Sequence, residues 1–248
     1  MYYSNDVSVD ILVNGNSTAK YYKDGKVYVE AKDGSEYEIL IKNNGFNKVL
    51  AVSSVDGLNV LNGEPSREVD SGYIINGYNS YRIKGFRYSD EKVGAFKFSK
   101  KENSYASSKS VELTINCGVI GVRIYNENVN YTLTANSTNS PTWISATYGT
   151  CIDDVTGPDL NSVFRASTGG DSNTKSLSFD MGSTWGQSKE SKVTSVDFDR
   201  GSVFRPFDIY YASRASLVEM GVIQASKPQV SFPNSFPKYA TPPKGWKE

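Results

Sequence analysis

The sequence predicts an all-β protein, an antiparallel β-sandwich of a jelly-roll-like or related kind, from three observations. Its first hundred residues contain seven Asn-Gly or Asp-Gly pairs, and these residue types tolerate the positive φ angles of two-residue type I′ hairpin turns. The segments between most pairs alternate apolar and polar residues or are rich in β-branched and aromatic residues, as strands are. One segment near the C-terminus has the pattern of a short helix. The seven pairs are Asn14-Gly15, Asp24-Gly25, Asp33-Gly34, Asn44-Gly45, Asp56-Gly57, Asn62-Gly63 and Asn76-Gly77.

About nine strands are predicted before residue 126, enough for two packed sheets. Residues 7–13 carry valine or isoleucine at every second position, which predicts a strand with one buried face. Two hairpins follow, one pairing residues 19–23 with 26–31 and one pairing residues 37–42 with 49–55. The further predicted strands are residues 73–75, 81–83, 93–98, 111–115 and 119–125.

Residues 126–192 differ in composition, because asparagine, serine, threonine and glycine replace most apolar runs. Long segments of this kind are functional or mobile loops, so we expect an excursion from the β-body. Within it, Gly182-Ser183-Thr184-Trp185-Gly186 is interpreted as a turn with a packed tryptophan. Strands at residues 192–200 and 207–211 are predicted to return to the same domain. The predicted division is a β-sandwich core at 1–125, the excursion at 126–192, returning strands and a short helix at 193–226, and an extended arm at 227–248.

The predicted helix covers residues 214–220. Ser213 is a suitable N-cap, and Leu217 and Met220 fall on one face. Gly221 can take the left-handed conformation that ends many helices.

The C-terminal arm has five prolines within residues 227–248, which predicts an extended path. Its aromatic side chains must cover either their own domain or a neighbouring chain, and the sequence leaves both destinations open. We expect them to be assembly contacts, because so aromatic a segment is unsuited to a solvated linker. These residues are Phe232, Phe236, Tyr239 and Trp246.

Composition excludes several classes of function. Lysine plus arginine and aspartate plus glutamate number 27 each, so no long-range field attracts nucleic acid, and no nucleic-acid partner is expected. The absence of histidine excludes Ser-His-Asp and Cys-His hydrolysis, histidine-ligated zinc and a histidine general base. Carboxylate chemistry stays open. We expect no catalytic, cofactor-binding or metal-binding residue and no cofactor.

The sequence shows no N-terminal secretory signal and no apolar stretch of the roughly 18–20 residues that a membrane span needs. We therefore expect neither secretion nor a membrane span. Without a secretory context, Cys117 and Cys151 are predicted to be free thiols, with Cys117 buried in the body.

Two groups of carboxylates are candidates for chemistry. Asp197 and Asp199 fall on one face of a predicted strand, and paired carboxylates can hydrolyse glycosides. The favoured interpretation is the wet face of an amphipathic strand, held by Arg200 or Arg205. A second group could offer oxygens to calcium but lacks the spacing of an EF-hand loop. That group is Asp153, Asp154 and Asp159.

The 17 tyrosines include three adjacent pairs, and in a strand one member of each pair should face outward. Ordinary β propensity explains them, and a surface for contact with protein or glycan is the alternative. The pairs are Tyr2-Tyr3, Tyr21-Tyr22 and Tyr210-Tyr211.

Short blocks between residues 37 and 222 resemble, in order and spacing, a family of β-rich proteins found in bacteria, their phages and large DNA viruses. The resemblance implies a β-rich body and an origin in a phage or virus particle, and it carries no catalytic residue to this chain. The blocks are S-V-D-G-L-N-V-L-N-G (54–63), S-G-Y-I-I (71–75), I-K-G-F-R (83–87), F-K-F-S (96–99), N-S-Y-A (103–106), N-C-G-V-I-G-V (116–122), G-S-T-W-G (182–186), V-D-F-D-R (196–200) and I-Y-Y-A-S-R-A-S-L-V-E-M-G-V (209–222).

We therefore expect a virion structural protein, made in the host cytoplasm, that serves as a minor capsid, decoration or vertex-associated subunit. Its partners would be other capsid or virion proteins, and self-association is a further contact that the sequence leaves open. One alternative is a fibre-associated or glycan-binding β module, which should show exposed aromatic side chains lining a groove. Another is a carboxylate-dependent glycosidase using Asp197 or Asp199, which needs two carboxyls about 5–10 Å apart in one cleft.

Overall fold

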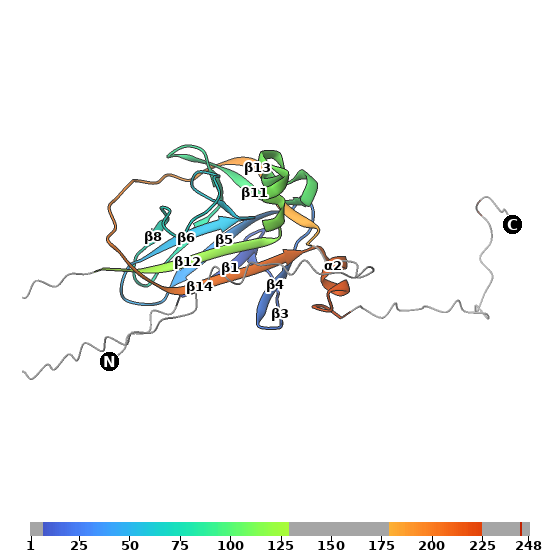
Figure 1. Ribbon diagram of the computed structural model, residues 1–248, viewed down its shortest axis with the longest axis horizontal. Coiled ribbons are helices and arrows are strands. Elements are labelled where there is room, and N and C mark those ends of the chain that lie inside the picture. Colours follow the sequence, from blue (N-terminus) through green and yellow to red (C-terminus); the bar gives the residue numbers. More distant parts are fainter. Residues whose placement is uncertain (1–6, 129–178, 225–243, 245–248) are drawn as a thin grey trace, which may run out of the picture.

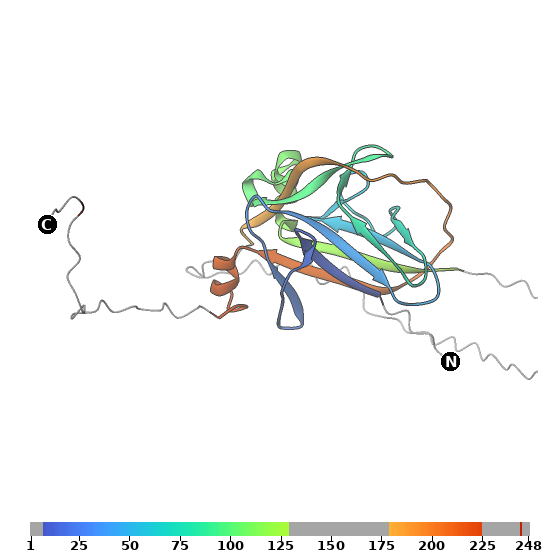
Figure 2. The same cartoon turned by 180° about the vertical axis from the view of Figure 1, so that it is seen from behind.

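A computed structural model describes residues 7–128, 179–224 and 244, and there the chain forms a sandwich of two seven-stranded sheets. The predicted all-β sandwich is thus confirmed. Views from opposite sides show the layer with β6, β12 and β14 on one side and the layer with β1 and β5 on the other (Figures 1 and 2). Every strand pair is antiparallel except β4 with β14, which is parallel.

The first sheet has the order β10-β11-β5-β1-β2, with β13 also paired to β11 and β9 to β5. Its strands are β1 (Val7–Val13), β2 (Asn16–Ser17), β5 (Glu36–Asn43), β9 (Asn79–Ile83), β10 (Gly85–Arg87), β11 (Lys92–Lys100) and β13 (Met181–Glu190).

The second sheet has the order β3-β4-β14-β12-β6-β7, with β8 also paired to β6. Its strands are β3 (Lys20–Lys23), β4 (Lys26–Glu30), β6 (Val49–Val55), β7 (Leu58–Asn59), β8 (Tyr73–Ile75), β12 (Val119–Glu127) and β14 (Arg200–Ala212). The helical elements are η1 (Lys101–Asn103), α1 (Tyr105–Lys109), η2 (Val111–Asn116) and α2 (Arg214–Glu219).

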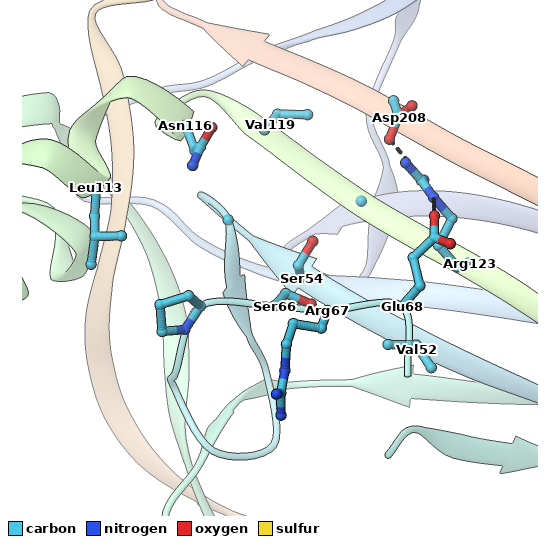
Figure 3. A pocket seen from close by; sticks show the side chains of 13 residues that line it. Val52, Ser54, Ser66, Arg67, Glu68, Leu113, Asn116, Val119, Arg123 and Asp208 are labelled. Atoms are coloured by element: carbon cyan, nitrogen blue, oxygen red, sulfur yellow. Dashed lines mark hydrogen bonds and ion pairs between the residues drawn. The ribbon is translucent and has the colours of Figure 1, made fainter. Parts of the chain in front are cut away.

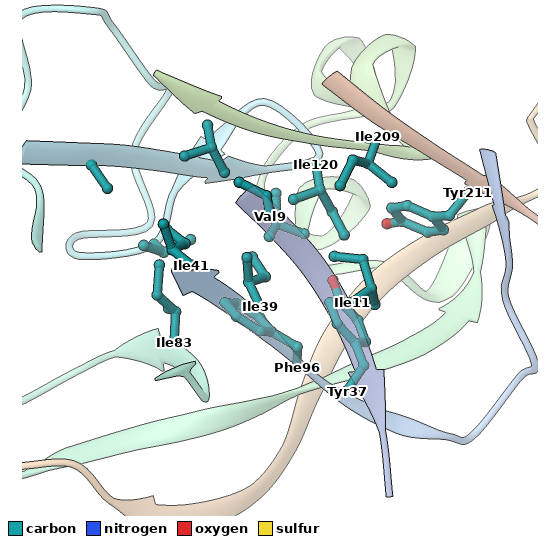
Figure 4. Packing of buried hydrophobic residues seen from close by; sticks show 14 of the residues in the cluster. Val9, Ile11, Tyr37, Ile39, Ile41, Ile83, Phe96, Ile120, Ile209 and Tyr211 are labelled. Atoms are coloured by element: carbon teal, nitrogen blue, oxygen red, sulfur yellow. The ribbon is translucent and has the colours of Figure 1, made fainter. Parts of the chain in front are cut away.

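The core lies between the sheets and is built from the inward side chains of both (Figure 4). Ile11 and Ile39 come from the first sheet and Ile120 and Ile209 from the second, and all four are buried. Burial of each such side chain contributes about 1.5–3 kcal/mol. Residues 7–13 place Val7, Val9 and Ile11 in this core, so the predicted half-buried first strand is confirmed.

Three of the seven Asx-Gly pairs have positive φ at both residues, as type I′ turns require. They are Asn14-Gly15 between β1 and β2, Asp24-Gly25 between β3 and β4, and Asp56-Gly57 between β6 and β7.

The hairpin predicted around Asn44-Gly45 is wrong, because β5 and β6 belong to different sheets. The Asn43 side chain holds this connection instead. Its Oδ1 accepts from Gly45 N, and its Nδ2 donates to the carbonyls of Asn47 and Ile75. The alternation of apolar and polar residues therefore predicted both strands correctly but did not predict which strands they pair with.

Two predicted strands are absent. Residues 111–115 lie in the 3₁₀ helix η2, where the Ser110 side chain accepts from Glu112 N and so favours a helical turn over extended backbone. Residues 192–199 are irregular, and β14 begins only at Arg200. Phe198 there packs against a small cluster on the outer face of the second sheet, with Leu50 and Tyr125. Tertiary packing outweighs local alternation in this segment.

The turn predicted around Trp185 is wrong as well, because this segment forms the strand β13 and pairs with β11. The predicted C-terminal helix is confirmed as α2. Ser213 Oγ accepts from Ser216 N at its start, and Gly221 has φ +67° just after it. The helix α1 was not predicted.

Candidate functional site

A chain of four polar side chains crosses the core from one sheet to the other. Tyr37 of β5 and Ser183 of β13 belong to the first sheet, and Tyr211 of β14 and Asp56 at the end of β6 belong to the second. The Ser183 hydroxyl lies 2.6 Å from the Tyr37 hydroxyl and 2.8 Å from the Tyr211 hydroxyl, and Tyr211 donates to Asp56 Oδ1 at 2.5 Å. The proton order runs from Tyr37 to Ser183 to Tyr211 to Asp56, because each hydroxyl has one proton to donate.

Two backbone groups complete the surroundings of the Asp56 carboxylate. Gly118 N donates to Oδ1 at 2.9 Å and Ser183 N donates to Oδ2 at 2.6 Å. Burial raises the pKa of Asp56 to about 6, and the hydrogen bonds from Tyr211, Ser183 and Gly118 lower it only in part. Burial, with the Asp56 charge, also raises the pKa of Tyr211 well above its usual value. Both are nearly inaccessible to solvent, with exposed fractions of 1% and 0%.

These enclosed hydrogen bonds tie the two sheets together. A substrate would need a path to Asp56, and none of its partners is exposed. Cys117 lies beside the same region, 3.4 Å from the Ser104 hydroxyl. It is a buried free thiol as predicted, and burial raises its pKa, as does the charge of Asp56. Cys151 lies outside the described residues.

Separated blocks of the sequence meet at this tie. Asp56 lies in the block at residues 54–63, Ser104 in the block at 103–106 and Gly118 in the block at 116–122. Ser183 comes from G-S-T-W-G and Tyr211 from the last block. The blocks thus share a structural task, the joining of the two sheets.

One accessible cavity, of about 440 Å³, lies on the outer face of the second sheet (Figure 3). The sheet forms its floor, where Gly121 of β12 pairs with Ser54 of β6. Leu113 and Asn116 of η2 form one wall (Figure 3). A Cβ atom on Gly121 would lie 2.8 Å from Ser54 Oγ, so glycine keeps the floor open.

Arg123 carries the charge at the opposite end of this cavity. Its Nη1 lies 2.9 Å from Asp208 Oδ1, and its Nε lies 3.6 Å from Glu68 Oε1, so the guanidinium stands between two carboxylates (Figure 3). Nη1 also donates to the Phe207 carbonyl at 3.3 Å. The two carboxylates of this cavity are therefore engaged by one cation, which suits a polar rim around a docked partner.

The helix η2 adds apolar surface beside the cavity. Its Leu113 side chain packs toward the core, whereas Val111 and Ile115 are 80% and 81% exposed. Val69, which follows Glu68 on the other wall, is 74% exposed. We call the cavity with Val111 and Ile115 the η2 surface.

The structure separates the carboxylates that the sequence singled out from this site. Asp197 and Asp199 are exposed on the irregular segment before β14 and do not line the cavity. Arg200, one of the two arginines expected to hold them, donates instead to the carbonyls of Glu68 and Asp70 and stacks over the Tyr125 ring. The expectation of a strand face shared by these residues is wrong.

Other predicted residues lie outside the described part of the chain. These are the calcium candidates Asp153, Asp154 and Asp159 and the expected assembly contacts Phe232, Phe236, Tyr239 and Trp246. Among the described residues, no three His, Cys, Asp or Glu side chains gather as metal ligands. Within the same residues, no helix is long and apolar enough to cross a membrane.

Sequence reasoning missed the cavity residues, and a partial signal for them existed. Tyr210 and Tyr211 do face opposite ways, with Tyr211 buried and Tyr210 half-buried, as the pairing of tyrosines predicts. The same alternation implies that Asp208 and Tyr210 share the outer face of β14. The contact of Asp208 with Arg123 depends on strand register, which the sequence does not specify.

Comparison with protein-family models, curated proteins and solved structures finds no match to this chain.

Proposed function

We propose that the protein is a virion structural protein, a minor capsid, decoration or vertex-associated subunit that acts through protein–protein contacts. The observation that carries the proposal is the η2 surface, where Val111 and Ile115 are exposed beside a cavity with a charged rim. The side chains best suited to chemistry, Asp56 and Cys117, are enclosed. No catalytic step is part of the proposal.

Energetics favours a partner at the η2 surface. Burying Val111 and Ile115 against another chain would contribute about 1.5–3 kcal/mol for each side chain. Arg123 and its two carboxylates would then orient the partner by charge complementarity. An apolar centre with a polar rim is the usual anatomy of a protein–protein interface.

Two features of the sequence add support. The blocks that resemble phage and viral proteins imply a particle as the setting. The aromatic residues of the C-terminal arm are proposed as a second set of contacts with neighbouring virion proteins or with another copy of the chain.

The η2 surface is tested by competition for incorporation. The double substitution Val111→Ser with Ile115→Ser should reduce the amount of chain in purified particles at least tenfold when it competes with the wild type, since about 1.4 kcal/mol corresponds to a factor of ten. Tyr22→Ser is the matched control, because Tyr22 is 73% exposed but lies in β3 of the hairpin β3–β4. Equal incorporation of the double variant and the control would contradict the role of the η2 surface.

A second variant separates the arm from the sandwich. A chain that ends at residue 227 keeps both sheets and the cluster around Leu217 and Ile223, so it should retain its β-type circular dichroism. Its incorporation should fall as well. Normal incorporation of the shortened chain would contradict the role of Phe232, Phe236, Tyr239 and Trp246.

A further inference from the structure

We propose that a second pocket, separate from the η2 surface, binds a neutral carbohydrate residue. The pocket has a volume of about 470 Å³. Three aromatic side chains and three polar ones define it, namely Trp185, Tyr88, Tyr105, Arg87, Asp90 and Asn62. They come from β13, the last residue of β10, the connection between β10 and β11, α1 and the loop after β7.

The aromatic rings form a packed wall. Trp185 lies at its centre, with the Tyr105 ring edge-on at 5.5 Å and the Tyr88 ring tilted at 5.8 Å. The buried Phe86 ring stacks on Trp185 at 6.0 Å from the core side. Each ring is therefore held by its neighbours before any ligand arrives.

Two local features of the chain keep this wall in place. A Cβ atom on Gly94 would lie 2.1 Å from Trp185 Cε3, so only glycine lets the indole ring lie across β11. The Tyr88 hydroxyl lies 2.6 Å from Ser188 Oγ, which fixes a ring that is 50% exposed. An aromatic platform that is rigid and partly exposed in the unbound protein costs little ordering on binding.

Polar groups at the rim remain available. Within the described residues, the Asp90 carboxylate has no hydrogen-bond or ion-pair partner, and the Asn62 side chain uses only its oxygen, which accepts from Glu64 N. Arg87 makes four hydrogen bonds, to Tyr73, the Ser89 carbonyl and two atoms of Ser191. The fifth of its N–H donors has no partner among the residues that the structure describes. The pocket thus offers donors and an acceptor to adjacent hydroxyl groups.

The charges of the pocket select a neutral ligand. A quaternary ammonium ion would suit aromatic rings and Asp90 but would face the Arg87 guanidinium. An anion would suit Arg87 but would face Asp90. A sugar ring satisfies both, because its C–H face can lie on the negative face of an aromatic ring while its hydroxyls bond to the rim.

The test uses the full chain and a panel of neutral oligosaccharides ending in glucose, galactose, mannose or N-acetylglucosamine. Saturation-transfer NMR should detect one or more of them, and titration should give a dissociation constant. Tyr88→Ala and Asp90→Asn should each weaken that binding about tenfold, since loss of a ring platform or a charged acceptor removes on the order of one such factor. Both residues are exposed, so both variants should fold.

Tyr78→Ala is the matched control, because Tyr78 is a 74% exposed tyrosine outside the pocket, and it should bind like the wild type. Three results would overturn the proposal: no binding of any neutral sugar at 10 mM, roughly the weakest affinity worth detecting; binding that survives both pocket variants; or a preference for choline or a sialylated sugar. Val111 and Ile115 do not line this pocket, so its failure leaves the assembly proposal standing.

Discussion

At the scale of single residues, Asp56 departs furthest from what its side chain prefers in water. Its carboxylate is buried between the sheets and ends a chain of hydroxyl groups that starts at Tyr37. A buried polar group is tolerable only when it is fully bonded, and both oxygens of Asp56 have donors. The tie therefore specifies how the two sheets register, at the cost of a charge held away from water.

The raised pKa of Asp56 makes stability depend on pH. Its pKa is about 6 in the folded chain against 3.8 as the usual value, so the folded state binds more protons between these limits. The stability contributed by this group falls as pH rises from about 4 to about 6 and is level above that. When the pH is lowered from 7.5 to 4.5, the free energy of unfolding of the wild type should rise by about 2 kcal/mol relative to that of Asp56→Asn, whose side chain cannot titrate.

Urea denaturation of both proteins at the two pH values measures this difference directly. The other carboxylates are common to both chains and cancel in the comparison. A difference between wild type and variant that is the same at pH 4.5 and pH 7.5 would show that Asp56 titrates normally.

Tyr211 allows a second test of the tie. Tyr211→Phe keeps the ring in the core but removes the donor to Asp56 and a partner of Ser183, so it should lower the free energy of unfolding by about 1–3 kcal/mol. Tyr210→Phe is the control on the same strand, since no hydrogen bond involves the Tyr210 hydroxyl in the described residues, and it should cost less than about 0.5 kcal/mol. If denaturant unfolding shows the same loss of unfolding free energy for Tyr211→Phe and Tyr210→Phe, the result would contradict the proposed role of these hydrogen bonds in joining the sheets.

At the scale of elements, the Asx-Gly turns differ in what surrounds them. Gly25 and Gly57 both have positive φ, at +71° and +76°. A Cβ atom on Gly25 would meet nothing within 4 Å, whereas one on Gly57 would lie 2.9 Å from the Asn116 Cβ. Of these two turns, only Asp56-Gly57 lies against another element, the C-terminal end of η2.

This contrast predicts unequal costs for the same substitution. Gly25→Ala should destabilise the protein by about 1–2 kcal/mol, the cost of the left-handed conformation alone. Gly57→Ala should cost at least about 1 kcal/mol more, because η2 must also move. Thermal unfolding of the two variants measures the difference, and equal melting temperatures would contradict the close approach.

The same elements show what the sequence could and could not predict. Local signals identified β1, most other strands and α2, because alternation and capping act within a few residues. They failed at η2, where a serine cap outweighs β-branched residues, and at the β5–β6 connection, where the sequence does not specify the partner strand. The site residues were missed for the latter reason: Arg123 meets Glu68 and Asp208 only through long-range packing.

At the scale of the whole molecule, the sandwich separates a closed interior from a surface suited to contacts. The polar groups in the interior join the sheets, whereas the η2 surface and the aromatic pocket are open. The sandwich thus carries two open regions, one proposed to bind a partner protein and one proposed to bind a sugar.

The composition of purified particles tests most directly whether the protein belongs to a virus particle, as we propose. Particles from infected or induced cultures of the host would be separated by density gradient, and peptides of this chain would be quantified by mass spectrometry in each fraction. The proposal predicts that the chain follows the major shell protein through the particle peak at a constant ratio that survives a high-salt wash. Recovery of the chain only in the particle-free fractions would contradict it.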